Sequence, residues 1–235
     1  MNTILQILFS PLKAFRALKQ ENKFPGMALL ILLLLLAVNL ILMVPITSKI
    51  TTLMLSQSSM PVAEEQLDRA LDMLHKLRYL QVIGGVFSSA MTLFLLALLL
   101  YIITLIAKPV LAYMKSFTVV VYSYFAILIG GLVNTGILYF RGLDKITNPF
   151  EITLTGLNLF TTLEKAGGGL YTFLSLVNPF QLWFIILLSI GLKVFTEIKF
   201  TKALLICILF WLITVIFPVA SMIFSEITLQ RAGMM

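Results

Sequence analysis

Charged residues divide this chain of 235 residues into blocks, and five intervals between them are long, apolar and free of charge. Each interval can hold the roughly 20 apolar residues that cross about 30 Å of hydrocarbon as a helix. The intervals lack the alternation of barrel strands, and backbone groups inside lipid must be bonded within the protein, so only helices remain. We therefore predict five membrane-spanning helices, over about 25–46, 80–107, 117–140, 178–195 and 203–224.

The segment before the first span predicts a helix at the membrane surface. Ser10-Pro11 has the form of a helix start, and Leu12, Phe15 and Leu18 then share one face while the cations lie elsewhere. Such a pattern is typical of an amphipathic helix that lies in the headgroup layer. We therefore expect residues 1–23 to form one interfacial helix on the cytoplasmic side.

The outer segments 47–79 and 141–177 predict short helices outside the membrane. In the first, a helix is expected from about Pro61 to Arg78, ahead of the second span. In the second, a short helix is expected over 157–165, stopped by the glycine run 167–169. The whole chain, residues 1–235, is thus predicted to be a single membrane domain, an all-α polytopic helical bundle. Late in its last span, Pro218 should kink or end the helix.

The positive charge is concentrated in three segments. Residues 2–23, 108–116 and 193–202 sum to +3, +2 and +2, which together make the net charge of +7. With five spans, these three segments fall on the same side of the membrane. Because basic residues are retained on the cytoplasmic side, we expect the N-terminus inside and the C-terminus outside. The charge therefore indicates a membrane surface and no nucleic-acid partner.

The sequence carries no pattern that indicates catalysis. HExxH, GxSxG, P-loop and Rossmann glycine patterns are missing, and the single histidine, His75, has no cysteine or second histidine near it. Away from their ends, the five spans contain no ionisable residue of the kind that marks ion-coupled carriers and intramembrane proteases. Lys193 and Glu197, at the end of the fourth span, are expected to pair with each other. We therefore expect a protein that is not an enzyme and has no metal site or cofactor.

Five polar side chains inside the predicted spans are candidates for a membrane site: Asn39, Ser88, Ser89, Asn134 and Thr135. They can form hydrogen bonds between packed helices, at about 0.6–2 kcal/mol each. Alternatively, they can line a polar groove if several helices bring them together. Glycine pairs at 84–85 and 130–131 lie close to them in sequence, and small residues allow helices to approach closely, so packing is our first interpretation.

Residues 178–211 combine several features into a helical hairpin. Asn178-Pro179 suits a helix start and leads into Phe180 and, three residues later, Trp183. Gly191 near the helix end, a basic turn, and Trp211 in the returning helix complete the pattern. Trp183 is expected at the outer aromatic belt, and Trp211, near mid-membrane, is expected to face other helices. Together with the SPLKAF segment, which contains Pro11 and Phe15, this pattern resembles the Yip1 (YIPF) family of membrane proteins, in its bacterial branch.

The resemblance implies an integral protein of the bacterial cytoplasmic membrane with an accessory role, since some bacterial members are associated with ABC-type exporters. The long N-terminal region and DLYGP-type motif of eukaryotic relatives, which engage small GTPases, are missing here. Our leading hypothesis is a non-enzymatic assembly or regulatory partner of other membrane proteins, with the lipid bilayer, a transporter complex or a second copy as its partners. The alternative is a passive or lipid-directed permease with a polar groove between helices.

Overall fold

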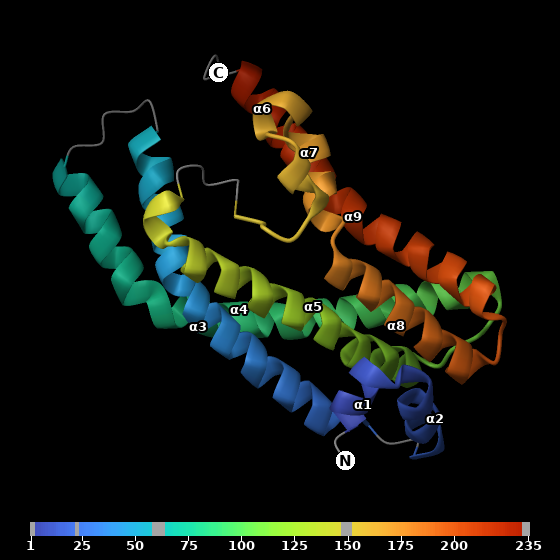
Figure 1. Ribbon diagram of the computed structural model, residues 1–235. Helices are drawn as coiled ribbons and strands as arrows, with labels where there is room; N and C mark the ends of the chain where they lie inside the picture. The colour runs from blue at the N-terminus through green and yellow to red at the C-terminus, as the bar shows by residue number, and fades with distance from the viewer. Residues whose placement is uncertain (1–2, 22–23, 58–63, 147–151, 232–235) are drawn as a thin grey trace.

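The computed structural model describes residues 3–21, 24–57, 64–146 and 152–231, and these ranges are almost entirely helical (Figure 1). The helices are α1 (Thr3–Phe9), α2 (Pro11–Glu21), α3 (Gly26–Gln57), α4 (Glu64–Ala107), α5 (Tyr113–Arg141), α6 (Leu163–Ala166), α7 (Gly168–Leu176), α8 (Pro179–Thr196) and α9 (Phe200–Arg231), with 3-10 turns at Leu143–Lys145 and Leu157–Phe160. Five helices are long and apolar enough to cross a membrane: Gly26–Leu53, Leu80–Ala107, Tyr113–Arg141, Pro179–Thr196 and Phe200–Phe224. The predicted all-α bundle with five spans is confirmed.

Helix α5 is the centre of the bundle and packs against α3, α4 and α8. Within its most apolar stretch 67% of the residues are buried by the protein itself, against 11% for α3. Every residue from 116 to 123 is buried, so the rest of the protein covers this part of α5 on all sides. A helix that is apolar all round suits such a position. The same composition in α3 instead leaves a broad apolar surface for lipid.

Residues 3–21 form two helices, so the single interfacial helix expected over 1–23 is wrong. The chain breaks at Ser10, because the proline that follows disfavours helical backbone at the residue before it. Helix α1 lies against α5 and α2 lies against α8. Ile7 and Phe15 are fully buried. Part of the apolar surface of each helix therefore packs on protein, while Leu5 and Phe9 of α1 stay exposed.

Three helices extend further than the sequence predicts. Helix α3, expected over about 25–46, runs through Pro45 to Gln57. Helix α4 runs without interruption from Glu64 to Ala107, so the helix expected over 61–78 is not separate from the second span. No proline lies within this range to interrupt it. Helix α9 continues through Pro218 to Arg231, so of the two outcomes expected there, a kink or an end, the end is wrong. Prolines are tolerated within membrane helices because neighbouring groups bond the freed backbone.

Helices α7 and α8 follow one another along α9 and break at residues 177 and 178 (Figure 1). Gly167 ends α6 with a positive φ of 73°, as a glycine stop should, but Gly168 and Gly169 then begin α7. A Cβ at Gly169 would lie 2.5 Å from Cγ1 of Ile223, so this glycine allows α7 to contact α9. The 18 residues of α8 span about 27 Å, just short of the hydrocarbon thickness, and α7 continues the line beyond it.

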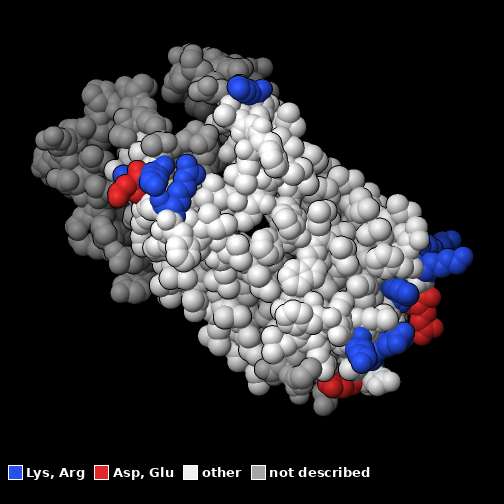
Figure 2. All heavy atoms as spheres, viewed as in Figure 1, with Lys and Arg blue, Asp and Glu red and all other residues white. Residues whose placement is uncertain are grey.

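Charged side chains gather toward two ends of the molecule, with a broad uncharged surface between them (Figure 2). Segments 2–23 and 193–202 meet where α2 contacts α8. Lys115 lines a cavity with Phe195, which places segment 108–116 at the same end. The three basic segments are therefore brought together at one end of the bundle, which we call the basic end.

Candidate functional site

The Asn-Pro-Phe segment starts α8 as predicted. Asn178 is the N-cap, and its side-chain oxygen accepts a hydrogen bond of 2.9 Å from the backbone N–H of Gln181. Pro179 occupies the first helical turn, where no backbone donor is needed. The role of this motif is thus to restart a membrane helix after the break that follows α7.

Phe180 and Trp211 make the contacts that hold this hairpin against its neighbours. A Cβ at Gly130 would lie 2.7 Å from Cβ and Cγ of Phe180, so only a glycine in α5 admits the phenyl group there. Trp211 faces α7, where its ring centroid lies 6.2 Å from that of Phe173. Its indole nitrogen is buried without a hydrogen-bond partner in the described part of the chain. Trp183 is half-buried and packs against the main core.

The two halves of the family-like pattern, Pro11 and Phe15 near the N-terminus and Gly191 in α8, meet in space. Pro11 is the first residue of α2, and one turn later Phe15 is fully buried. A Cβ at Gly191 would lie 3.0 Å from Cζ of Phe15 and 2.6 Å from Cγ1 of Val119. The glycine therefore provides the space in which the α2 phenyl group packs between α8 and α5.

An ion pair closes the same contact at the basic end. The Lys19 ammonium donates to Oε1 of Glu197 at 2.6 Å and to the backbone oxygen of Val194 at 3.0 Å. The expected pairing of Glu197 with Lys193 is therefore wrong. Glu197 ends α8 with a left-handed φ of 60°, which turns its side chain out of the i,i+4 geometry. The hydrogen bond from Lys19, and then its charge, lower the pKa of Glu197 below its ordinary value.

Asn39 and Thr135 bond to each other across α3 and α5. The Thr135 hydroxyl donates to Oδ1 of Asn39 at 2.9 Å. Gly131 lies one helical turn before Thr135, and a Cβ there would lie 3.2 Å from Nδ2 of the same asparagine. One turn further along α5, the Tyr139 hydroxyl donates to the backbone oxygen of Leu42 at 2.7 Å. These residues form the interhelical hydrogen bonds predicted for packed membrane helices.

Asn134 has a different role, because it binds the backbone of the second outer segment. Its amide nitrogen donates to the Ile152 oxygen at 3.0 Å, and its amide oxygen accepts from the Leu154 N–H at 2.7 Å. The side chain thus bonds one backbone acceptor and one backbone donor of the outer segment, as a peptide group would. Asn134 is therefore a structural clamp on residues 152–154.

Further along the outer segment, a buried asparagine that the sequence did not single out has a similar part. The Asn158 amide donates to the Thr153 oxygen at 2.9 Å and to the Tyr171 hydroxyl at 3.1 Å. It is 2% exposed. Its position two residues after Gly156, in a segment unusually apolar for a loop, was the only signal that could have found it. Asn158 ties the outer segment to α7.

The serine pair of α4 is split between two surfaces. Ser89 is half-buried on the side of Gly85, where a Cβ would lie 2.8 Å from Cδ1 of Leu40 in α3. Its hydroxyl donates to the Gly85 oxygen of its own helix at 2.8 Å. Ser88 and Gly84 are exposed, and a Cβ at Gly84 would meet nothing within 4 Å. The five polar candidates therefore do not gather on one cavity.

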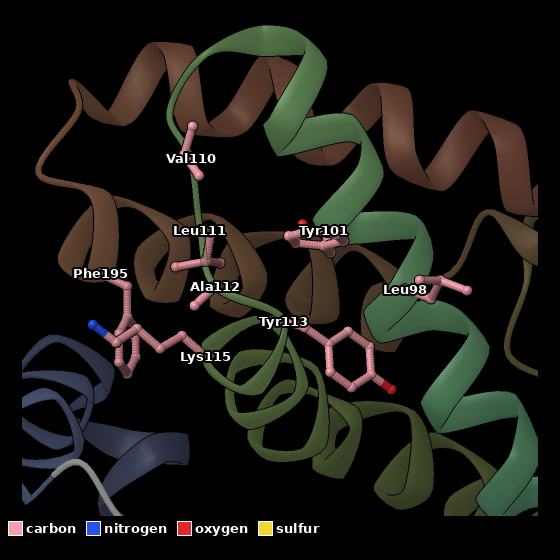
Figure 3. Close-up of a pocket in the computed structure, with 8 residues that line it drawn as sticks. All are labelled: Leu98, Tyr101, Val110, Leu111, Ala112, Tyr113, Lys115 and Phe195. Atoms are coloured by element: carbon pink, nitrogen blue, oxygen red, sulfur yellow. The ribbon is translucent and has the colours of Figure 1, made fainter.

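Two cavities open at the basic end. The larger, of about 570 Å³, lies where the connection after α4 enters α5, and Figure 3 shows Tyr101, Tyr113, Lys115 and Phe195 among its lining residues. The rings of Tyr101 and Tyr113 meet edge to face with centroids 6.3 Å apart. The smaller cavity, of about 270 Å³, lies between α2 and the end of α8. Within the described ranges, His, Cys, Asp and Glu residues form no group of three or more that could hold a metal ion.

Comparison with known proteins identifies the family. No curated protein and no solved structure matches the chain. The family model described as the Yip1 domain matches residues 5–222. That range includes α2, the first four spans, the fifth span up to residue 222, and the hairpin with its Asn-Pro-Phe start. The contacts of Phe15 with Gly191 and of Phe180 with Gly130 join segments that lie far apart within that match. This chain therefore belongs to the Yip1 domain family.

Proposed function

We propose that this protein is a non-enzymatic accessory partner that binds another membrane protein through the outward face of α4. The observation that carries the proposal is the position of Gly84 and Ser88. Both are exposed, one turn apart, and a Cβ at Gly84 has open space around it. Thr92, one turn further, is exposed as well. We call these three residues the α4 stripe.

Small residues along a membrane helix allow a second helix to approach closely, and that is how membrane helices associate where no hydrophobic force draws them together. Contact with lipid tails does not require small residues, because lipid tails pack equally well against large apolar side chains. The α4 stripe is bordered by large exposed side chains, with Ile83 67%, Phe87 71% and Met91 52% exposed. The small side chains of the α4 stripe thus lie beside larger exposed ones, a surface that would let the backbone of another helix come close to α4.

The polar side chains inside the spans support packing over transport. Asn39, Asn134 and Thr135 are each bonded to another helix or to the outer segment. A polar groove would need these side chains free and directed toward a common space. A permease with such a groove is therefore the less favoured function.

The setting that fits the proposal is a cytoplasmic membrane, with the basic end facing the cytoplasm. All three basic segments lie at that end, and positive residues are retained on the cytoplasmic side. An ABC-type exporter subunit is one partner that the family resemblance suggests. The α4 stripe itself requires only a membrane helix with small residues of its own.

Affinity purification in mild detergent, from membranes of the source cell, tests the proposal. The unchanged protein should recover one membrane protein in a stoichiometric amount. Gly84→Leu should lower that recovery about tenfold, because the leucine keeps another helix from coming close to α4 and each tenfold needs only about 1.4 kcal/mol. Gly136→Leu is the matched control, since Gly136 also has nothing within 4 Å and lies on α5.

Two results would contradict the proposal. One is purification of a clean oligomer without any partner in several detergents. The other is full recovery of the partner by Gly84→Leu, with Gly136→Leu behaving in the same way.

A further inference from the structure

The smaller cavity of the basic end has an unusual set of charges on its wall. It opens between α2 and the last turn of α8, and its lining includes Arg16, Lys19, Lys193 and Glu197. Segments that are far apart in the chain bring these groups to a volume of about 270 Å³. That is close to the lower end of the roughly 300–1,000 Å³ of small-molecule sites. The cavity is therefore large enough to hold a small polar group of a ligand.

One of the three cations is already paired. Lys19 lies 2.6 Å from Glu197, and no other ion pair forms among the residues whose side chains the structure describes. Arg16 and Lys193 are therefore left without an acidic partner in the part of the chain that the structure describes. The lining carries three positive charges and one negative charge, and so a net charge of +2.

The C-terminal end of α8, which lies beside the cavity, repels an anion only weakly. A helix C-terminus exposes carbonyl oxygens and repels negative charge. Here the Val194 oxygen accepts from Lys19 at 3.0 Å, and the Lys193 oxygen accepts from the Glu197 N–H at 2.8 Å. Lys19 thus covers the negative end of α8 as well as neutralising Glu197.

We infer that this cavity binds a phosphate monoester, carried by a lipid headgroup or by a soluble molecule. A phosphate monoester carries about −1.5 to −2 charges at pH 7, which matches the +2 of the lining. The Arg16 guanidinium can grip two phosphate oxygens at once, and Lys193 adds a point charge. Leu12, Val194 and Ile198 form apolar walls beside these cations. Basic pockets at the ends of membrane helices suit lipid headgroups for the same reasons.

The test uses the full-length protein in detergent micelles and counts bound lipid by native mass spectrometry. The probes are short-chain phosphatidic acid, which is a monoester, phosphatidylglycerol, which is a diester, and phosphatidylcholine. Phosphatidic acid should be retained best. Arg16→Gln with Lys193→Gln should weaken its binding about tenfold or more, since both free cations are lost. Neither substitution touches the Lys19–Glu197 pair. The two single variants are measured as well, and unfolding temperatures equal to that of the unchanged protein show that the fold is kept.

Lys13→Gln is the matched control, because Lys13 is exposed on the same helix and does not line the cavity. It should change binding less than about twofold. Inorganic phosphate separates the two sources: displacement of phosphatidic acid at equal concentration supports a soluble phosphate ester, and no displacement supports a lipid. Equal retention of all three lipids, or an equal loss with Lys13→Gln, would overturn the inference.

Discussion

Helix α4 presents two faces with nearly the same residues and opposite environments. Gly85 and Ser89 face α3, where a Cβ on the glycine would lie 2.8 Å from the Leu40 side chain. Gly84 and Ser88 face outward, with nothing within 4 Å of a Cβ on the glycine. The first face has its partner within this chain. The second has the same chemistry and no partner within the described residues, which is why we assign it to another protein.

The same contrast occurs in α5 and gives the largest expected effect. Gly130→Ala should lower the free energy of unfolding by about 1–3 kcal/mol, because the new methyl group would lie 2.7 Å from Cβ of Phe180, which cannot move aside without the backbone. Gly136→Ala should leave stability unchanged or raise it by up to about 1 kcal/mol, because the site is open and alanine favours helix. Unfolding in mixed micelles measures both, and equal effects would remove the distinction between inner and outer glycines.

The clamp at Asn134 should give the next largest effect. Asn134→Leu removes both bonds to the outer segment and leaves the Ile152 oxygen and the Leu154 N–H without their partner. The expected cost is about 1–2 kcal/mol. Hydrogen exchange should rise at residues 152–154 and stay unchanged in α4. Unchanged protection of that segment would show that the clamp does not hold it.

A smaller effect is expected for the bond between α3 and α5. In a double-mutant cycle, Asn39→Leu and Thr135→Val should show a coupling of about 0.6 kcal/mol, the typical value for polar pairs within membranes. The bond of 2.9 Å is the reason to expect coupling at all. A cycle of Ser88→Ala with Thr135→Val is the control, and it should show none. Coupling in the control but not in the first pair would mean that the assigned contacts are wrong.

The smallest effect belongs to the ion pair at the basic end, because Glu197 is 81% exposed and salt screens exposed pairs. Its pKa is lowered in the folded protein from an ordinary value of 4.5. The stability that the pair contributes is therefore present above pH 4.5 and lost as the pH falls through the lower, folded pKa. Unfolding temperatures of the unchanged protein and Glu197→Gln should differ at neutral pH and converge on acidification. A constant difference at every pH would contradict the pairing.

The sequence was sufficient for the features that depend on hydrophobicity. The five spans, the cap at Asn178 and the family could be predicted, because block length, the Asn-Pro start and the spacing of the motif are local properties. The helix start at Ser10-Pro11 was visible as well, but the separate helix α1 before it was missed. What could not be predicted were choices that depend on the neighbouring helix.

The glycine and serine pairs show this limit. Each of the pairs Gly84-Gly85 and Ser88-Ser89 consists of two identical, adjacent residues. Only the position of α3 decides which residue of the pair is covered. The partner of Glu197 was misassigned for a related reason, since local spacing favoured Lys193 while folding brought Lys19 closer. Hydrophobic pattern determines how many helices cross the membrane. Side-chain volume and rotation about the helix axis determine which faces meet.

The most direct test of the account is a pair of photo-crosslinking residues placed at positions 88 and 89 in the native membrane. A crosslinker at position 88 should join the chain to another membrane protein, and one at position 89 should give only products within this chain, through α3. A crosslinker at 88 that captures lipid alone, or one at 89 that captures the other protein as efficiently, would contradict the assignment of the outward face of α4 to a partner.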